Sequence, residues 1–293
     1  MRIFITGASG WIGSAVVPEL VNAGHQVLGL ARSDASERAV IAMGAEVLRG
    51  DLNDTDVLRA GALGSDGVIH LAFVVPSMSE AATRTDAKAI ETFAAALAGS
   101  GKPLVISGAT LVTPGRPATE RDELVAAGPV AARIANMRAA LAAAEAGVRT
   151  SLVMLPRSVH GQGERHGFVP QLIATARAKG VCGYIGDGAS RWPAVHVKDA
   201  AALYGLAVGH APAGSVLNAV GDEGVPVREI AEAIGRHLHL PARSLPAEEF
   251  DGMLMRLLST DMPASSTITQ QLLGWKPTHP GLIEDIEQGH YFV

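Results

Sequence analysis

The chain has 293 residues and a net charge of −5 at pH 7; 48% of the residues are hydrophobic, 18% are charged and 4% are aromatic. This composition excludes a lone small module and a disordered chain, because it supplies enough apolar side chains for a sizeable buried core. Basic and aromatic residues are too sparse for a nucleic-acid surface, so we expect no nucleic-acid partner.

No stretch approaches the roughly 18 apolar residues of a membrane helix, and a glycine-rich turn comes too early for a secretory signal, so we expect no membrane partner. Cys182 is the only cysteine, which excludes an intrachain disulfide and a Cys-x-x-Cys metal site. The histidines and carboxylates show no metal-ligand spacing, so we expect no metal. A single cysteine suits a reducing compartment, and we expect a cytoplasmic protein.

Short β-branched runs alternate with longer Ala-rich segments of helical periodicity between Arg2 and about Val153. This alternation is typical of βαβ units, which form a parallel sheet covered by helices on both faces. We therefore predict an α/β protein with a doubly wound parallel sheet. The six predicted strands are Ile3–Thr6, Gln26–Ala31, Glu46–Arg49, Gly67–His70, Leu104–Ser107 and Thr150–Met154.

The pattern changes after Leu155, where prolines and glycines separate short elements. We predict one domain over residues 1–155, with later segments such as 190–220 as candidates to join it, and a smaller lobe over residues 156–293. Gly186-Asp187-Gly188 is interpreted as a hairpin turn. Tyr184 and Trp192 flank it and are candidates to line a pocket, although packing explains them equally well. Within this lobe, helices are predicted at 168–179, 198–208 and 227–238, and strands near 183–185 and 194–197.

A glycine-rich turn, residues 7–13, follows the first predicted strand and precedes a helical pattern. Gly7 permits a tight turn, Gly10 lets backbone approach a diphosphate, and Gly13 lets the helix pack against the strand. The helix N-terminus favours an anion through its free N–H groups and its dipole. An ordinary strand-to-helix turn has similar spacing, but the ends of two further predicted strands follow at the positions that a Rossmann-type dinucleotide site requires.

The segment from Thr6 to Gly13 reads TGASGWIG. It resembles the TGxxGxxG signature of the extended and atypical short-chain dehydrogenase/reductase families, which are relatives of NAD(P)-dependent epimerases and dehydratases. The resemblance extends over nearly the whole chain, including the segments around His160 and from Arg191 to Ala200. It implies that residues 1–155 form a Rossmann-type NAD(P)-binding domain and residues 156–293 a C-terminal substrate lobe.

The same resemblance assigns further residues to the cofactor. Asp51 and Leu52 resemble the pair that contacts adenine, Leu71 and Ala72 resemble the segment beside the adenosine ribose, and Pro156 resembles a residue that backs the nicotinamide. The complete set of expected cofactor-binding residues is Thr6, Gly7, Ser9, Gly10, Trp11, Ile12, Gly13, Arg32, Ser33, Asp51, Leu52, Leu71, Ala72 and Pro156.

The end of the second predicted strand distinguishes NADP from NAD. An acidic side chain there binds both ribose hydroxyls of NAD, whereas an arginine accommodates the 2′-phosphate of NADP. Arg32 and Ser33 occupy this place, so NADP is expected rather than NAD. The alternative is that Arg32 is a solvated surface residue and that Asp34 supplies the acid slightly later in the chain.

The catalytic half of the resemblance is incomplete. The related enzymes usually carry a Tyr-x-x-x-Lys pair, in which lysine lowers the pKa of the tyrosine so that the phenol can exchange a proton. The three tyrosines here are Tyr184, Tyr204 and Tyr291, and none is followed by lysine at that spacing. The sequence therefore lacks the residues of ordinary alcohol–ketone chemistry, and it resembles the atypical members of the short-chain dehydrogenase/reductase families.

Three residues remain as catalytic candidates. Ser107 or Thr110 at the end of the fifth predicted strand could hydrogen-bond a substrate carbonyl, and His160 after the sixth could relay a proton. Each has a structural alternative, since hydroxyl groups often bond loop backbone and histidines often fix loops. His166 and Arg133 are weaker candidates for a proton relay and for orienting an anionic substrate.

Together these observations favour an NADP-dependent oxidoreductase that transfers hydride to or from a small carbonyl, alcohol or enone. A nucleotide-sugar epimerase or dehydratase shares the fold but lacks its tyrosine here. A non-catalytic NADP-binding redox sensor is a third reading, which the absent Tyr/Lys pair supports. The expected partner is a small-molecule substrate, and homodimers through two sheet-covering helices are common among similar proteins.

Overall fold

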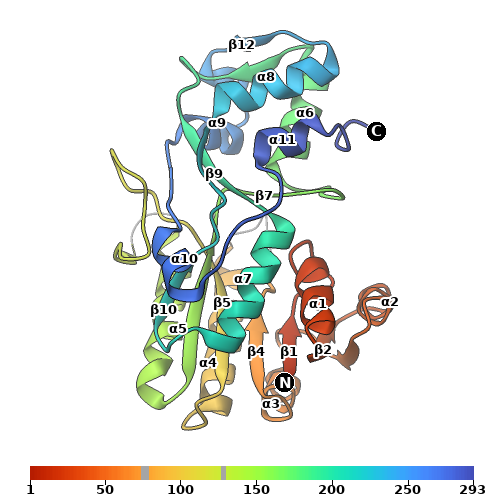
Figure 1. Ribbon diagram of the computed structural model, residues 1–293, viewed down its shortest axis with the longest axis vertical. Coiled ribbons are helices and arrows are strands. Elements are labelled where there is room, and N and C mark those ends of the chain that lie inside the picture. The colour runs from red at the N-terminus through yellow and green to blue at the C-terminus, as the bar shows by residue number, and fades with distance from the viewer. Residues whose placement is uncertain (74–78, 127–129) are drawn as a thin grey trace.

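The computed structural model describes residues 1–73, 79–126 and 130–293. Within these ranges its larger part is a seven-stranded sheet in the order β10-β6-β5-β4-β1-β2-β3. All neighbouring strands run parallel, which brings their carboxyl ends to one edge (Figure 1). This confirms the predicted α/β fold with a Rossmann-type doubly wound sheet. The strands are β1 (Arg2–Thr6), β2 (Gln26–Ala31), β3 (Glu46–Arg49), β4 (Gly67–His70), β5 (Pro103–Ala109), β6 (Arg149–Leu155) and β10 (Ser215–Asn218).

All six predicted strands are present, and β2, β3 and β4 have the predicted bounds. The predicted number was wrong, because β10 adds a seventh strand to the described part of the sheet. β10 pairs with β6 only after the second lobe has interrupted the chain. Its Val216 and Leu217 pack against opposite faces of the sheet. So short an apolar run, outside the alternation of strands and helices, does not by itself predict a strand.

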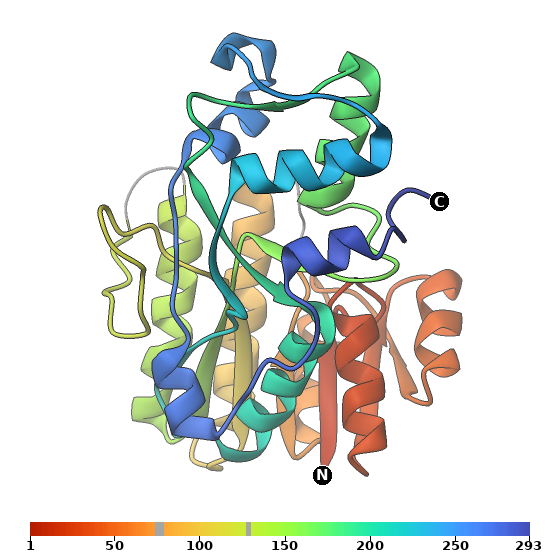
Figure 2. The same ribbon diagram turned by 45° about the horizontal axis from the view of Figure 1, so that its top comes forward.

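The side chains of β1 alternate between two buried clusters, with Ile3 and Ile5 in one and Phe4 in the other. The first face of the sheet is covered by α1 (Gly13–Asn22) and α7 (Val197–His210). The second is covered by α3 (Thr55–Leu63), α4 (Glu80–Leu97) and α5 (Ala131–Ala142), as Figure 2 shows. α2 (Asp34–Ala42) packs beside β2 and β3.

The second lobe lies beyond the carboxyl edge of the large sheet (Figure 1). It has its own core around the buried Trp192. Its described strands form a sheet of β7 (Ser158–His160), β9 (Arg191–His196) and β11 (Asp222–Pro226) and a pair of β8 (Cys182–Tyr184) and β12 (Ala242–Ser244). Its helices are α6 (Phe168–Lys179), α8 (Val227–Leu238), α9 (Gly252–Ser259) and α11 (Leu282–Glu287), and the remaining elements are α10 (Thr267–Leu273), η2 (Ala143–Ala146) and η3 (Ala247–Glu249). Among the described residues, no helix is both long enough and apolar enough to cross a bilayer.

The interpretation of Gly186-Asp187-Gly188 as a hairpin turn was wrong. β8 before the turn pairs in parallel with β12, whereas β9 after it pairs with β7 and β11. The two glycines do have the positive φ angles of a tight turn. The local signal was therefore correct for the turn, but long-range pairing decides which strands meet.

Asp199 in the first turn of α7 holds the returning C-terminal segment. Its carboxylate accepts hydrogen bonds from the backbone N–H groups of Thr278 and His279, both at 3.0 Å, and from Nδ1 of His279 at 2.7 Å. Its backbone carbonyl accepts a bond from the indole of Trp275 at 3.0 Å. The Asp199 carboxylate is buried, so its bonds to Thr278 and His279 compensate for its own loss of hydration.

We predict that Asp199→Ala lowers the free energy of unfolding by about 1–3 kcal/mol, because it removes the charged acceptor that ties Thr278 and His279 to α7. Asp187→Ala is a suitable control, since Asp187 is exposed and, among the described residues, accepts a bond only from the backbone of Ala189. Urea denaturation of the two variants measures the difference. Equal losses of stability would show that Asp199 is not a structural clamp.

Candidate functional site

The glycine-rich turn brings the start of α1 against the end of β1. Gly7 has a φ of +73°, and a Cβ atom there would lie 2.7 Å from the backbone nitrogen of Ala72. A Cβ atom on Gly13 would lie 2.2 Å from the carbonyl oxygen of Gly7. Neither position can hold a side chain, so the turn forms a backbone cradle that only glycine permits. This cradle fits a diphosphate at the helix N-terminus.

Trp11 connects the cradle to the second lobe. Its indole Nε1 donates a hydrogen bond to the carbonyl of Val159 in β7 at 2.7 Å. Ser9 and Gly10, on the same turn, are exposed, and Ile12 immediately precedes α1. The turn is therefore fixed from its protein side, while its outer backbone is open to a ligand.

The end of β2 carries Arg32 and Ser33. Arg32 is exposed and makes no ion pair with any described residue. Ser33 caps α2, because its hydroxyl accepts a bond from the backbone N–H of Ser36 at 3.3 Å. Asp34, the alternative acid, forms an ion pair with Arg49 at 3.2 Å. A guanidinium without an ion pair to any described residue therefore lies at the position that is expected to distinguish NADP from NAD.

The other expected cofactor residues lie at ends of the same strands. Asp51 follows β3 and accepts a bond from the backbone of Asn53 at 2.7 Å, with Leu52 next to it. Leu71 and Ala72 follow β4, and buried Pro156 follows β6. Because these strands are parallel, the residues share the carboxyl edge, where ligands bind in such sheets.

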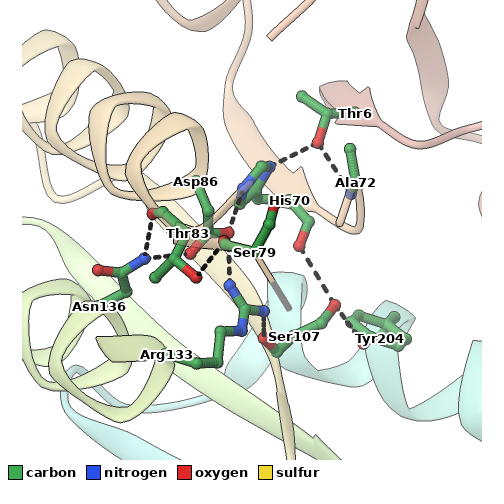
Figure 3. Close-up of polar contacts among 10 residues, drawn as sticks. All are labelled: Thr6, His70, Ala72, Ser79, Thr83, Asp86, Ser107, Arg133, Asn136 and Tyr204. Atoms are coloured by element: carbon green, nitrogen blue, oxygen red, sulfur yellow. Dashed lines mark hydrogen bonds and ion pairs between the residues drawn. The ribbon is translucent and has the colours of Figure 1, made fainter. Parts of the chain in front are cut away.

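A buried polar network lies at the centre of this edge (Figure 3). Thr6 Oγ1 lies 2.6 Å from Nδ1 of His70, and it accepts a bond from the backbone N–H of Ala72 at 3.3 Å. His70 Nε2 lies 3.2 Å from Asp86, which also pairs with Arg133. These contacts are all satisfied when Thr6 donates to Nδ1 and the ring donates from Nε2 to the carboxylate.

Asp86 is the charged centre of this network. Burial raises its pKa, but hydrogen bonds and charge from His70 and Arg133 outweigh burial and lower the pKa to about 2. Asn136 adds a third donor, with its Nδ2 atom 2.6 Å from Asp86 Oδ2. The carboxylate thus joins β4, α4 and α5, and it neutralises Arg133, which was a candidate to orient an anionic substrate.

Ser107 in β5 belongs to the same network. Its hydroxyl lies 2.7 Å from the hydroxyl of Tyr204 in α7 and 3.2 Å from the carbonyl of His70. Burial raises the pKa of Tyr204, so this phenol stays protonated. Thr110 differs, because it is buried and its hydroxyl has no hydrogen-bond partner in the described part of the chain. Its backbone N–H donates to the carbonyl of Leu155 at 2.9 Å, which places it beside the end of β6.

Comparison with known proteins agrees with this geometry. The model of the NAD dependent epimerase/dehydratase family matches residues 3–219, which include the glycine turn and the strands of the large sheet from Ile3 onwards. The chain belongs to the NAD dependent epimerase/dehydratase family. Proteins similar to this chain include a reductase, a dehydrogenase and an epimerase, according to their names.

Three similar proteins illustrate the range within this likeness. An uncharacterized protein of Schizosaccharomyces pombe is 44% identical over 298 residues, covering 100% of both chains. The 2-alkyl-3-oxoalkanoate reductase of Stenotrophomonas maltophilia is 31% identical, covering 80% of this chain and 74% of the reductase. The structure of Thermus thermophilus UDP-glucose 4-epimerase with NAD has a TM-score of 0.75 at 20% identity, covering 99% of each chain, and supports the fold.

The structure places His160 in a buried cluster rather than at an open surface, next to Val159, which bonds to the glycine-rich turn through Trp11. Its Nδ1 atom lies 3.0 Å from Asp285 of α11, and its Nε2 atom has no described partner. Its ring contacts His196 edge to face, with centroids 5.6 Å apart. Burial, followed by the charge of His160, lowers the pKa of His196 to about 4. His166 is exposed, and the described residues contain no cluster with the make-up of a metal site.

Tyr291 joins two carboxylates of this cluster. Its hydroxyl lies 2.8 Å from Glu164 and 3.3 Å from Asp285, and it accepts a bond from the backbone N–H of Gly161 at 3.0 Å. Burial, with the added charge of Asp285, raises the pKa of Glu164 to about 7 although Tyr291 opposes the shift. A protonated Glu164 can donate to Tyr291, which then donates to Asp285, so every group has a partner.

Sequence reasoning missed several members of these two networks. Asp86 and Asn136 lie on helices where a polar residue resembles an ordinary solvent face, and Tyr204 lies in an Ala-rich helix. Glu164 and Asp285 are far apart in sequence and meet only through the fold. The one available signal was an acid inside an apolar helical stripe, as at Asp86.

We predict that Glu164→Gln removes a pH dependence from stability. The folded state binds the Glu164 proton more tightly than the unfolded state, so this group's contribution to stability declines as pH rises from about 4.5 to 7. Glutamine does not titrate. The variant should therefore gain about 2–3 kcal/mol on the wild type between pH 5 and pH 8, as measured by urea denaturation.

The difference between variant and wild type matters here, because His196 has a lowered pKa and contributes the opposite slope below pH 6.5. Glu248→Gln is the control, since Glu248 is exposed. For this variant, the plot of unfolding free energy against pH should stay parallel to that of the wild type. Parallel curves for Glu164→Gln as well would contradict the protonated state of Glu164.

Proposed function

We propose that the protein is an NADP-dependent oxidoreductase of the atypical short-chain dehydrogenase type. The observation that carries the proposal is the backbone cradle at Gly7 and Gly13, which fits a dinucleotide diphosphate at the start of α1. The expected residues around it follow strands of the same edge. When bound, NADPH supplies hydride to a small carbonyl or enone, or the oxidised form takes hydride from an alcohol.

The preference for NADP rests on Arg32. This side chain is exposed at the end of β2, and it is not neutralised by any described acid. The nearby Asp34 forms an ion pair with Arg49, so it is a poor partner for the ribose hydroxyls that NAD presents. A guanidinium matches a phosphate through paired N–H donors, which favours the 2′-phosphate.

The acceptor oxygen is held, in this proposal, by Thr110 or Ser107. Thr110 has an uncommitted hydroxyl, whereas the Ser107 hydroxyl is shared with Tyr204. The chain has no Tyr-x-x-x-Lys pair, so the proton that completes reduction comes from water, the substrate or His160. Of these, His160 is the most restricted, because it is fully buried against Asp285.

A nucleotide-sugar epimerase is the second candidate, since UDP-sugar enzymes share the fold and the sequence family. Two measurements separate a reductase from an epimerase. Fluorescence titration first measures NADPH binding, and the loss of NADPH absorbance is then followed with a panel of carbonyls and enones. A reductase consumes NADPH. An epimerase converts UDP-sugars with no net consumption, and tight binding without turnover of either kind would favour a redox sensor.

We predict that Arg32→Asp weakens NADPH binding by about 10–100-fold while leaving NADH binding unchanged or tighter, because it removes a charge-assisted pair with the 2′-phosphate. Arg59→Asp makes the same change of charge at an exposed position of α3 and serves as the control. Fluorescence titration measures both affinities. An equal effect of the two variants would assign the loss to overall charge.

We predict that Thr110→Val slows hydride transfer by about tenfold or more but leaves thermal stability unchanged or higher, because a buried hydroxyl without a partner costs stability. Ser107→Ala tests the other hydroxyl, and Tyr204→Phe is its control because it removes only the hydroxyl partner. Neither Thr110→Val nor Ser107→Ala should change NADP affinity. Unchanged single-turnover rates in both would exclude these hydroxyls from the reaction.

A further inference from the structure

Arg157 lies where the chain passes from the large sheet into the second lobe. It follows Pro156 directly, two residues beyond the end of β6. Its guanidinium carbon is 5.5 Å from the centre of the Trp192 ring, and Nη1 donates to the carbonyl of Leu257 at 3.4 Å. Nη2 contacts the sulfur of Met262. The side chain therefore lies against the second lobe, next to the residue expected to back the nicotinamide.

No carboxylate neutralises Arg157. Among the described residues it forms no ion pair, and the eight residues outside the description include no acid. The nearest acid in sequence to Met262 is Asp261, which is held by Arg191 through bonds of 3.0 and 2.8 Å. Burial lowers the pKa of Arg157 to about 10, so the group is still a cation at neutral pH. A partly buried cation without a counter-charge costs free energy, which an incoming anion would recover.

The described residues also leave most of the hydrogen-bonding capacity of Arg157 unused. A guanidinium has five N–H donors arranged as a planar fork that matches the oxygens of a carboxylate or phosphate. The Leu257 carbonyl accepts one long bond, and the Met262 thioether is a weak acceptor. By contrast, Arg133 and Arg228 are paired with Asp86 and Glu232.

We propose that Arg157 binds the carboxylate or phosphate of an anionic carbonyl substrate, and so determines which substrates the enzyme accepts. The ligand's being a substrate rests on the proposed function, whereas the anion site itself rests on Arg157 alone. A 3-oxo acid would supply a carboxylate, and a nucleotide sugar would supply phosphate. In either case the anion anchors one end of the substrate while its carbonyl lies towards the ends of β5 and β6.

Calorimetry on the full chain with saturating NADP⁺ tests the site with two matched pairs of probes. 3-Oxooctanoate is compared with its methyl ester, and UDP with uridine. We expect one anion to bind about tenfold or more tightly than its uncharged partner, and the pair that shows it identifies the source of the anion. Arg157→Met should remove this preference without changing NADP⁺ affinity, and Arg157→Lys should retain part of it.

Arg228→Met is the control, because Arg228 also lies over an aromatic ring and its loss changes the charge equally. Its anion preference should match that of the wild type. Should Arg157→Met melt at a lower temperature, Arg157→Lys and Arg157→Gln give the comparison in folded protein. Equal binding of each charged and uncharged probe, or a preference that survives in Arg157→Met, overturns the proposal. The same titrations without NADP⁺ show an Arg157-dependent anion site even where NADP⁺ binding, and with it the proposed function, fails.

Discussion

The close approach of α1 to β1 is the constraint on which the candidate site depends. Because a Cβ atom at Gly13 would lie 2.2 Å from the Gly7 carbonyl, the helix can start this near the strand only with glycine there. That contact aims the N-terminal N–H groups of α1 across the carboxyl edge of the sheet. Trp11 then transmits the position of the turn to β7 through its bond to Val159, so the second lobe is aligned with the same edge.

Buried polar groups, rather than apolar contacts alone, determine how the second lobe meets the sheet. Asp199 binds the C-terminal segment at His279. The carboxylate of Asp285 lies 3.0 Å from a ring nitrogen of His160 and 3.0 Å from a ring nitrogen of His290. Desolvating such groups offsets much of their attraction, so their main effect is to select one arrangement over others of similar apolar burial. In this arrangement burial raises the pKa of Glu164 to about 7, so its surroundings favour the protonated carboxyl group over the anion.

The sequence predicted the regular parts because their signals are local. The alternation of β-branched runs with Ala-rich segments predicted β1 to β6. Gly7, Gly10 and Gly13 predicted the turn, because each is needed where a side chain would clash within the adjoining strand, turn and helix. β10 and the pairing of β8 with β12 depend on segments that meet only after folding. Asp86 and Tyr204 were missed for the same reason, since nothing near them in sequence shows that they contact His70 and Ser107.

Two arginines paired with acids contrast with the two that the proposals assign to ligands. Arg133 and Arg191 form ion pairs with Asp86 and Asp261, and these pairs help to hold α5 and β9 in place. Arg32 and Arg157 have no such partner and lie after β2 and β6, on opposite sides of the strand reversal between β1 and β4. A ligand that crosses the reversal, with phosphate at the β2 side and an anionic substrate beyond its other end, would meet both. If both proposals hold, Arg32 and Arg157 together give the ligand a direction that the glycine turn alone leaves open.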